Sequence, residues 1–525
     1  MKHFNVNFEP DGKQVSIHAG ATLLEAAGLV GIVLNTNCGE RGTCEKCAVN
    51  LEPSGQRVLS CQYRIQSDLT VTVPETSRFF QQKILTEGVD TQLKGHFDIH
   101  EKYHRADQVY GLAIDIGTTT VVAKLIDMSD GSCLSTRAIL NPQVRYGDDV
   151  ISRITYADSD EKLAQLQQVL LGGINELIAG LCSDNAISSA QIYEICAVGN
   201  TTMNHLFLKL PVTQLGQAPY EAYCLDAKDT SVEQFPLEIN PLGNVHTVEN
   251  IAGFVGSDTI AAALAVEIDS AEKMTLIIDI GTNGEIVLGS KDKLYAASCA
   301  AGPAFEGARI SQGSRAVSGA IEAVVINDED IDLDVIDSVT ARSICGSGLI
   351  DAVAVLLELG VIDSTGRFVE PEKVKEFLSP KILSRIITYD SQPTFILADN
   401  GDDGQVMLTQ KDIREVQLAK AAIRTGIKLM QKKLGVEDDG VERILLAGAF
   451  GNYIRRESAL RIGLTPRVPP ECIHFVGNAA SSGAQIILLS SQTRDMARKL
   501  SRKIEYVEIA HEKDFTSVYA DSMMF

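Results

Sequence analysis

The stretch YGLAIDIGTTT at residues 110–120 decides the fold, and a related stretch, TLIIDIGTNGE, follows at residues 275–285. Each copy is an apolar run that ends in Asp, a Gly and then hydroxyl or amide residues, and a second β-rich run comes next, at 121–126 and 286–288. Two apolar runs joined by a Gly-containing turn are typical of a β-hairpin. The sequence therefore predicts two matched hairpins.

Two such hairpins, facing each other, have the chemistry to hold a polyphosphate. A glycine lets the backbone approach a phosphate oxygen, hydroxyl and amide groups donate hydrogen bonds, and an Asp pair orients Mg²⁺ through water. We expect Asp115 and Asp279 to orient the metal ion. The expected phosphate-binding residues are Gly117, Thr118, Thr119, Thr120, Gly281, Thr282 and Asn283. Two ordinary buried strands with Gly turns are the alternative, which a single copy would favour and two matched copies disfavour.

The paired Asp-Ile-Gly-Thr turns resemble the phosphate-1 and phosphate-2 loops of the superfamily of actin, sugar kinases and heat-shock ATPases. This resemblance implies a two-lobed α/β, ribonuclease H-like fold with ATP and Mg²⁺ between the lobes. It also implies an adenosine-binding glycine turn late in the chain, and ILLAGAFGN at residues 444–452 fits it, with Gly448 and Gly451 lining adenosine. The resemblance covers residues 109–490, and residues 477–484 resemble the small-residue helix where the two lobes hinge.

A separate unit precedes this module, at residues 1–76. Apolar residues alternate on both sides of an Asp-Gly turn and predict a hairpin, and residues 69–73 predict a closing strand. Thr22 and Glu25 form a capping-box pattern that opens a short helix through Val30.

Four cysteines lie between that helix and the closing strand, with the spacing C-x5-C-x2-C-x13-C. They are Cys38, Cys44, Cys47 and Cys61. Four thiolates are what a 2Fe–2S cluster requires, whereas zinc ribbons usually pair two C-x2-C motifs and only one is present here. A zinc site and unrelated buried cysteines are the alternatives. The surroundings resemble a β-grasp ferredoxin of the adrenodoxin-like branch.

Residues 77–108 are polar and weakly patterned, so we expect a linker with helical character at 79–85. Its histidines, His96, His100 and His104, are spaced four apart and would share one helix face. A solvated helix face is the favoured interpretation, and a metal site is the alternative. The rest, 109–525, is the expected ATPase-like domain, with lobe I at about 109–270 plus the C-terminal segment and lobe II at about 271–475.

Four helices are expected in this domain, at 161–181, 259–266, 349–359 and 413–434. The apolar run 195–199 predicts a buried strand whose polar end, from Asn200, faces the cleft. Cys345-Gly346-Ser347-Gly348 opens one of the helices, and two interpretations stay open there: an anion at the helix N-terminus, or glycines for close packing.

The composition restricts the class of protein. The chain has 525 residues, enough for two or three domains, and a formal net charge of −22, which argues against binding to nucleic acid or an anionic membrane. No apolar run is long enough to span a membrane, and no G-x-x-x-x-G-K-[ST] motif of a P-loop ATPase is present. Eleven cysteines, mostly without regular spacing, indicate a reducing compartment, so we expect a cytoplasmic protein.

A 2Fe–2S domain joined to an actin-like ATPase resembles the reductive activators of corrinoid-dependent enzymes. The resemblance implies ATP-dependent electron transfer from the cluster to an inactive Co(II) corrinoid protein, which restores Co(I) for methyl transfer. It implies a corrinoid protein or methyltransferase as partner and a low-potential electron donor of ferredoxin or flavodoxin type, and it leaves a homodimer open. A distinct middle domain is expected to be missing or much reduced. The alternatives are an ATP-driven activator of another low-potential enzyme, a small-molecule kinase with a regulatory cluster, and a non-enzymatic electron carrier.

Overall fold

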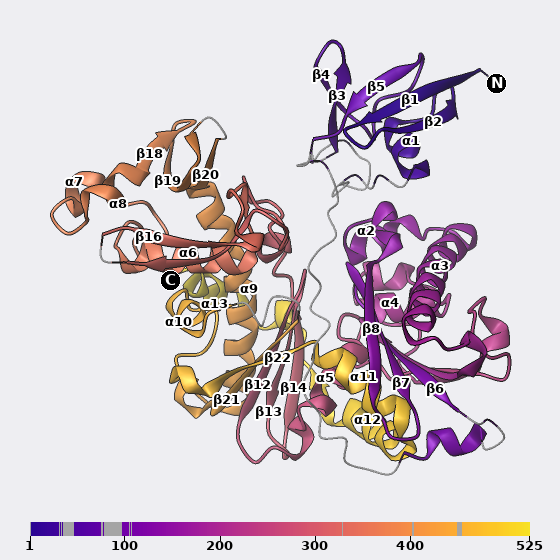
Figure 1. The fold of residues 1–525 in the computed structure, drawn as a ribbon. Coiled ribbons are helices and arrows are strands. Elements are labelled where there is room, and N and C mark those ends of the chain that lie inside the picture. The colour runs from indigo at the N-terminus through magenta and orange to yellow at the C-terminus, as the bar shows by residue number, and fades with distance from the viewer. Residues whose placement is uncertain are drawn as a thin grey trace.

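The computed structural model describes residues 2–30, 32, 34, 42, 47–74, 77, 97–103, 106, 108–327, 329–401, 404–448 and 454–525. Figure 1 shows the three parts of the chain that these residues form: a small N-terminal unit and two larger lobes. Within these residues, none of the helices is both long and apolar enough to cross a membrane.

The N-terminal unit is a five-stranded sheet with one helix, drawn at the top of Figure 1. Its strand order is β2-β1-β5-β3-β4, with β1 and β5 parallel in the centre. The elements are β1 (His3–Glu9), β2 (Lys13–His18), α1 (Leu23–Leu29), β3 (Ala48–Glu52), β4 (Gln56–Leu59) and β5 (Leu69–Thr72). This is the β-grasp arrangement, and it has an apolar core of its own.

Local sequence signals place α1 where they predicted it. Thr22 accepts a hydrogen bond from the backbone N–H of Glu25 at 3.1 Å, and Glu25 accepts one from the backbone N–H of Thr22 at 2.6 Å. Both donors would otherwise lack a partner at the helix start, so the expected capping box is confirmed. The helical character expected at 79–85 lies outside the described residues.

The first lobe is built on a six-stranded sheet with the order β10-β11-β9-β6-β7-β8. Its strands are β6 (Tyr110–Ile116), β7 (Thr120–Asp127), β8 (Cys133–Leu140), β9 (Ile192–Gly199), β10 (Lys228–Ser231) and β11 (Asn244–Thr247). Its helices on one face are α2 (Val150–Tyr156), α3 (Asp160–Asn185) and α4 (Thr201–Phe207). The hairpin predicted at 110–126 is β6 and β7, which pair antiparallel.

The second lobe repeats this plan with the order β22-β21-β12-β13-β14-β23. Its strands are β12 (Thr275–Ile280), β13 (Gly284–Gly289), β14 (Leu294–Cys299), β21 (Arg443–Ala447), β22 (Ile473–Gly477) and β23 (Ile504–Tyr506). In both sheets the signature strand is paired in parallel on one side and forms an antiparallel hairpin on the other. The two sequence copies therefore occupy equivalent positions in two related sheets. The long helix α9 (Gln410–Leu434) covers one face of the second sheet.

An insertion between β14 and α9 extends the second lobe. Its elements are β15 (Ala320–Ile326), β16 (Ile331–Val335), β17 (Ser343–Ile344), α6 (Gly346–Glu358), α7 (Pro371–Val374), α8 (Pro380–Arg385), β18 (Ile386–Tyr389), β19 (Gln392–Asp399) and β20 (Gln405–Thr409). A Cβ on Gly348 would lie 2.2 Å from the backbone oxygen of Ile321, so this glycine allows α6 to pack directly on β15. Of the two interpretations left open for this helix start, the structure favours close packing.

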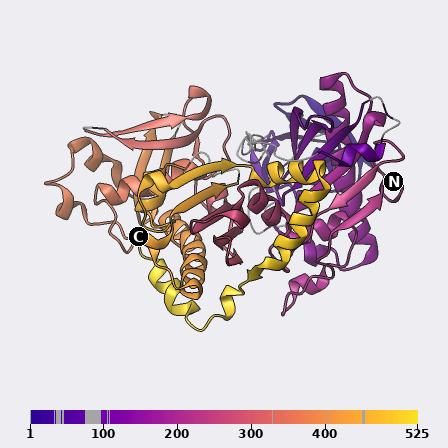
Figure 2. The same ribbon diagram turned by 90° about the horizontal axis from the view of Figure 1, so that it is seen from below.

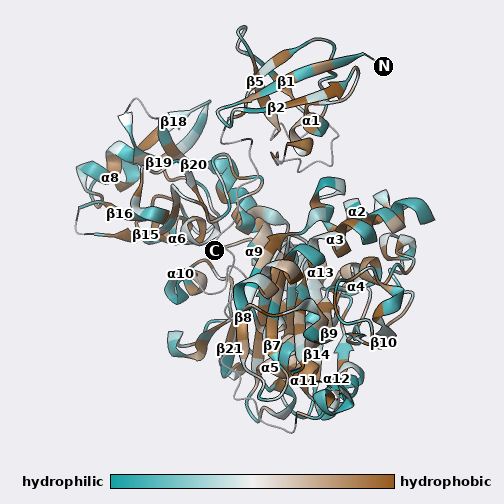
Figure 3. Cartoon of the chain, turned by 45° about the vertical axis from the view of Figure 1, so that its right-hand side comes forward, coloured by the Kyte–Doolittle hydropathy of each residue, from teal (hydrophilic) through white to brown (hydrophobic). Residues whose placement is uncertain are grey.

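Two apolar helices fill the space between the sheets. They are α5 (Ser257–Ala265) and α11 (Ala479–Leu489), and their buried side chains join apolar residues from both sheets in one core. The brown colour of the inner elements and the teal of the outer helices in Figure 3 show the same distribution. α5 leads from the first sheet into the second, and α11 follows β22. A movement of one lobe against the other must therefore involve this helix pair.

The C-terminal segment, which was expected to belong to lobe I, is shared between the lobes. α11 packs on β6 and β9 of the first sheet, and α12 (Ser491–Lys503) packs on α5. Further on, β23 pairs with β14, and α13 (Phe515–Ser522) packs on α9. Figure 2 shows this yellow segment passing from the region between the lobes to the second lobe, where α10 (Arg456–Arg461) also lies.

Candidate functional site

The turns that connect β6 to β7 and β12 to β13 are tight because each contains a glycine. The backbone N–H of Gly117 donates to the Thr120 oxygen at 2.9 Å, and that of Gly281 donates to the Asn283 oxygen at 3.0 Å. A Cβ on Gly117 would lie only 2.6 Å from the Thr120 oxygen. The turns thus bring backbone and hydroxyl donors to the ends of the strands that carry Asp115 and Asp279.

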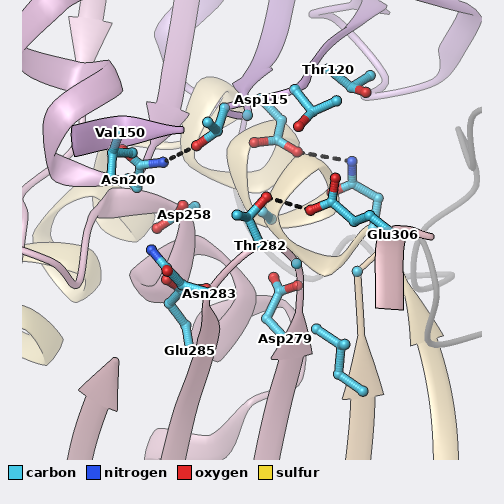
Figure 4. A pocket seen from close by; sticks show the side chains of 18 of the residues that line it. Asp115, Thr120, Val150, Asn200, Asp258, Asp279, Thr282, Asn283, Glu285 and Glu306 are labelled. Atoms are coloured by element: carbon cyan, nitrogen blue, oxygen red, sulfur yellow. Dashed lines mark hydrogen bonds between the residues drawn. The ribbon is translucent and has the colours of Figure 1, made fainter. Parts of the chain in front are cut away.

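Both turns open into one cavity of about 200 Å³. Figure 4 shows Asp115 from the first sheet and Asp279 from the second pointing into the same space. The predicted site residues that line this cavity are Asp115, Gly117, Thr118, Thr119, Thr120, Asp279, Gly281, Thr282, Asn283 and Gly448. The structure therefore gathers every described residue predicted for the nucleotide site, while Gly451 lies outside the described residues.

Six carboxyl residues line this cavity: Asp115, Asp149, Asp258, Asp279, Glu285 and Glu306. Burial, the largest cause, raises the pKa of Asp115 to about 6 and that of Asp279 to about 7. Burial together with the nearby charges of Asp115 and Asp279 raises the pKa of Asp258 to about 7. Burial and the charges of Asp258 and Asp279 also raise the pKa of Glu285. Crowded carboxylates of this kind favour a hard divalent cation such as Mg²⁺, because its charge removes their mutual repulsion.

Neighbouring side chains fix the first turn. Asn200, at the end of β9, donates from Nδ2 to the Thr118 hydroxyl at 2.9 Å, and Asn141 donates to the Gly117 oxygen at 2.8 Å. The buried Arg153 guanidinium donates to the Thr118 backbone oxygen and, at 2.8 Å, to that of Gly147. These contacts hold the turn in place from behind. The expectation that the polar end of the 195–199 strand faces the cleft is confirmed, because Asn200 lines the cavity.

Gly448 lies where the backbone passes directly behind the second Asp. Its φ is +88°, in the left-handed region, and a Cβ would lie 2.5 Å from Asp279 Oδ1. Its N–H donates to the Gly477 oxygen at 3.2 Å, which holds the end of β21 to β22. Any side chain at this position would displace the Asp279 carboxylate, so only glycine fits.

Sequence reasoning missed three polar residues of the cavity, Asp149, Asp258 and Asn478. Asp258 is in the first turn of α5, which is fixed to the end of β9 by hydrogen bonds of 3.0 and 3.1 Å between Ser257 and Gly199. Asn478 is the N-cap of α11 and donates to Asp115 Oδ2 at 2.9 Å. For Asp258 and Asn478, the only signal in the sequence was a polar residue at the start of an Ala-rich helix.

The described part of the cysteine cluster is Cys47 and Cys61, since Cys38 and Cys44 lie outside the described residues. Both thiols are buried, with their sulfur atoms 3.4 Å apart. This separation is too long for a disulfide and close to the separation of about 3.8 Å for two thiolates on one tetrahedral metal ion. The described pair therefore fits a shared metal centre. Of the linker histidines, His100 is described, and His96 and His104 are not.

A β-grasp unit with two adjacent buried cysteines, followed by two related sheets around a carboxylate-lined cavity, defines a class of protein: a ferredoxin-type domain fused to an actin-like nucleotide-binding domain. Three family models match it: the 2Fe-2S iron-sulfur cluster binding domain at residues 4–76, the RACo middle region at 110–271, and the C-terminal domain of RACo, the ASKHA domain, at 273–525.

The relatives match most or nearly all of the chain. The protein is 33% identical to the corrinoid activation enzyme RamQ of Eubacterium limosum over 98% of both chains. It is 25% identical to the reductase of a Co(II) methylated amine-specific corrinoid protein of Methanosarcina barkeri, over 78% of this chain and 76% of that protein. A solved reductive activator for a corrinoid, iron-sulfur protein superposes with a TM-score of 0.70 and 30% identity, over 99% of this chain and 98% of the other. The protein belongs to the RACo family.

One expectation from the sequence was wrong. A middle domain was expected to be missing or much reduced, yet residues 110–271 match the RACo middle region. The first lobe, with its own phosphate-type turn, is that region. The sequence does not reveal the middle region as a separate domain, because its sheet repeats the plan of the second lobe and the two together resemble one ATPase domain.

Proposed function

We propose that this protein is an enzyme that uses ATP to reduce an inactive Co(II) corrinoid protein, with its ferredoxin-type domain as the source of the electron. The observation that carries the proposal is the combination, in one chain, of two buried, adjacent cysteines in a β-grasp domain with a two-lobed, carboxylate-lined cavity. The relatives named for corrinoid activation and reduction support the same reaction, because they match this chain along most of its length.

At the nucleotide cavity, Asp115 and Asp279 would orient Mg²⁺, whose charge would offset that of the phosphates, and Asp258 and Glu285 would add negative charge in the same cavity. Thr118, Thr119, Thr120, Thr282 and Asn283 donate to phosphate oxygens, Gly117 and Gly281 allow the close approach, and Gly448 and Gly451 line adenosine. In the absence of the cation the pKa values of Asp115, Asp258 and Asp279 are raised. We therefore expect the ion and its nucleotide to bind together when these carboxyl groups are ionised.

At the cluster, Cys38, Cys44, Cys47 and Cys61 are the four proposed ligands of the 2Fe–2S centre, which supplies one-electron chemistry when bound. Cys47 precedes β3 and Cys61 follows β4, so the sheet itself fixes the distance between these two thiols. The described pair is buried, which limits the access of water to the sulfur atoms.

Coupling between the two sites runs through the lobes. Plant-type 2Fe–2S clusters have potentials near about −400 mV, so reduction of Co(II) needs an added source of free energy. A cavity made by two lobes is a two-state element that a nucleotide can close. We expect closure of this cavity to move α5 and α11, because Asp258 and Asn478 lie at the starts of these helices and also line the cavity.

Further parts of the proposal concern organisation and partners. The proposed domain boundaries are 1–76, 77–108 and 109–525, with lobe I at about 109–270 plus the part of the C-terminal segment that packs on it, and lobe II at about 271–475. The proposed electron donor is a low-potential ferredoxin or flavodoxin, a homodimer is one proposed state, and the cytoplasm is the proposed location.

The test is anaerobic mixing of the purified protein with a Co(II) corrinoid protein and a low-potential reductant, with and without ATP. Visible absorption reports the appearance of Co(I). ATP-dependent Co(I) formation supports the proposal, and equal Co(I) formation without ATP contradicts the energy coupling. Release of ADP that depends on a small-molecule substrate and on no electron acceptor would instead indicate a kinase.

A further inference from the structure

A second cavity, of about 760 Å³, lies in the second lobe. Its walls are the C-terminal half of α9, the turn that follows this helix, residues 463–467 and the last five residues of the chain, 521–525. None of the residues that line it also lines the nucleotide cavity. It is therefore a separate site, and the function proposed above makes no use of it.

This second cavity gathers positive charge on a protein whose formal net charge is −22. Five cationic side chains line the cavity: Lys420, Arg424, Lys428, Lys432 and Arg467. The first three are spaced four residues apart on α9 and so lie on one helix face, where like charges repel. Three acidic residues also line it, of which Asp438 is already bound to Arg424 by contacts of 2.6 Å.

Buried donors in this cavity have no partner within the described part of the chain. Arg424 is 7% exposed and uses Nη2 to bind Asp438, while its Nη1 atom is buried without a hydrogen bond. The hydroxyl groups of Thr465 (1% exposed) and Ser522 (2% exposed) are buried without one as well. Buried polar groups are nearly always paired, so three unpaired groups among the residues that line one cavity point to a ligand.

Lys420 shows that this positive charge is not neutralised. Its ammonium donates to the Met524 backbone oxygen and lies 5.4 Å from the centre of the Phe525 ring. Burial, followed by repulsion from Arg424, Lys428 and Arg467, lowers the pKa of Lys420 to about 7. An anion bound in the cavity would offset this repulsion among the cationic side chains.

We infer that this cavity binds a small phosphate-bearing molecule through Arg424, Lys428, Thr465 and Ser522. A guanidinium, an ammonium and two hydroxyls from different elements offer donors in several directions, which suits the oxygens of a tetrahedral phosphate. The volume exceeds that of a phosphate ion and falls in the range of about 300–1,000 Å³ typical of small-molecule sites. The ligand is therefore a phosphorylated small molecule rather than nucleic acid, which the negative charge of the whole chain would repel.

The experiment is isothermal titration calorimetry of the full-length protein with inorganic phosphate, pyrophosphate and AMP. The three probes separate a site for the bare anion from a site for a phosphorylated nucleoside. Lys428→Gln is the main variant, because Lys428 is partly exposed and its replacement leaves the Arg424–Asp438 pair intact. Arg424→Gln is the second variant. Lys433→Gln is the matched control. This lysine is also on α9, near the face formed by Lys420, Arg424 and Lys428, but it is exposed and pairs with Glu512 at 2.8 Å.

We expect at least one probe to bind the wild type, Lys428→Gln to weaken that binding about tenfold or more, and Lys433→Gln to change it less than about twofold. Absence of binding by all three probes at millimolar concentration overturns the inference. Binding that survives Lys428→Gln but is lost in Asp279→Asn also overturns it, because the probe then occupies the nucleotide cavity. Since the readout is binding and not Co(I) formation, the result is independent of the function proposed above.

Discussion

Replacing Asp258 by asparagine tests the electrostatics of the nucleotide cavity most directly. Asp258 is in the first turn of α5, where a negative charge is ordinarily favourable by about 0.3–1 kcal/mol. Its pKa is nevertheless raised from 3.8 to about 7, by burial first and then by Asp115 and Asp279. Desolvation and repulsion therefore outweigh the helix dipole. Asparagine keeps the shape and the acceptor that binds the Thr259 N–H at 2.7 Å.

The magnitude follows from this shift of about three pKa units, each equivalent to about 1.4 kcal/mol, which gives an upper limit of about 4 kcal/mol. The side chain is partly exposed to the cavity, where water screens the charges, so we expect about 1–2 kcal/mol. The folded-state pKa is raised above the unfolded value, so the cost is absent below about pH 4 and complete above about pH 7. Asp258→Asn should therefore stabilise the nucleotide-free protein at pH 8 and have little effect at pH 4.

The assay is calorimetric unfolding of the full-length protein at pH 5 and pH 8, because the chain has no tryptophan to report by fluorescence. The unfolding entropy grows with chain length, so for residues 109–525 we expect the melting temperature to rise by only about 1 °C per kcal/mol at pH 8. Mg²⁺ with ATP should stabilise the wild type more than the variant, because the variant has lost one carboxylate.

The matched control is Asp160→Asn, which removes an exposed Asp from the first turn of α3 and should lower the melting temperature slightly. The reasoning is refuted if Asp258→Asn destabilises the nucleotide-free protein at pH 8, or if its effect is the same at pH 5 and pH 8.

Three further predictions concern the cluster, the nucleotide and the hinge. The reconstituted protein should hold two irons and two acid-labile sulfides per chain, and Cys47→Ser should lose cluster stability; zinc in place of iron would contradict the assignment. Asp115→Ala and Asp279→Ala should each abolish ATP-dependent Co(I) formation and leave the visible spectrum of the cluster unchanged, because the two sites lie in domains with separate cores; a bleached spectrum would show that the domains depend on each other. A Cβ on Gly483 would lie 1.9 Å from the Ala261 backbone oxygen, so Gly483→Ala should separate α11 from α5 and slow ATP-dependent reduction at matched cluster content, while dithionite still reduces the cluster; an unchanged rate would remove the helix pair from the mechanism.

The local features of this fold were readable from the sequence because each depends on residues close together in the chain. The two signature hairpins and the capping box at Thr22 formed as expected. The expected helices at 161–181 and 413–434 formed within a few residues of their predicted bounds, as α3 and α9. Spacing alone also placed Asp115 and Asp279 on matching strands, and the structure brings them to one cavity. Apolar periodicity and turn chemistry determine such features before any tertiary contact forms.

Only the tertiary structure could add Asp258 and Asn478 to the site, because each begins a helix that reaches the cavity by packing between two sheets. The same is true of the second cavity. The repeat of Lys420, Arg424 and Lys428 is visible in the sequence and predicts one charged helix face. The unpaired hydroxyl groups of Thr465 and Ser522 belong to segments more than thirty residues away, and only the folded chain brings them into the same cavity as this helix face. Contacts between distant segments depend on the packing of whole elements, which local sequence does not specify.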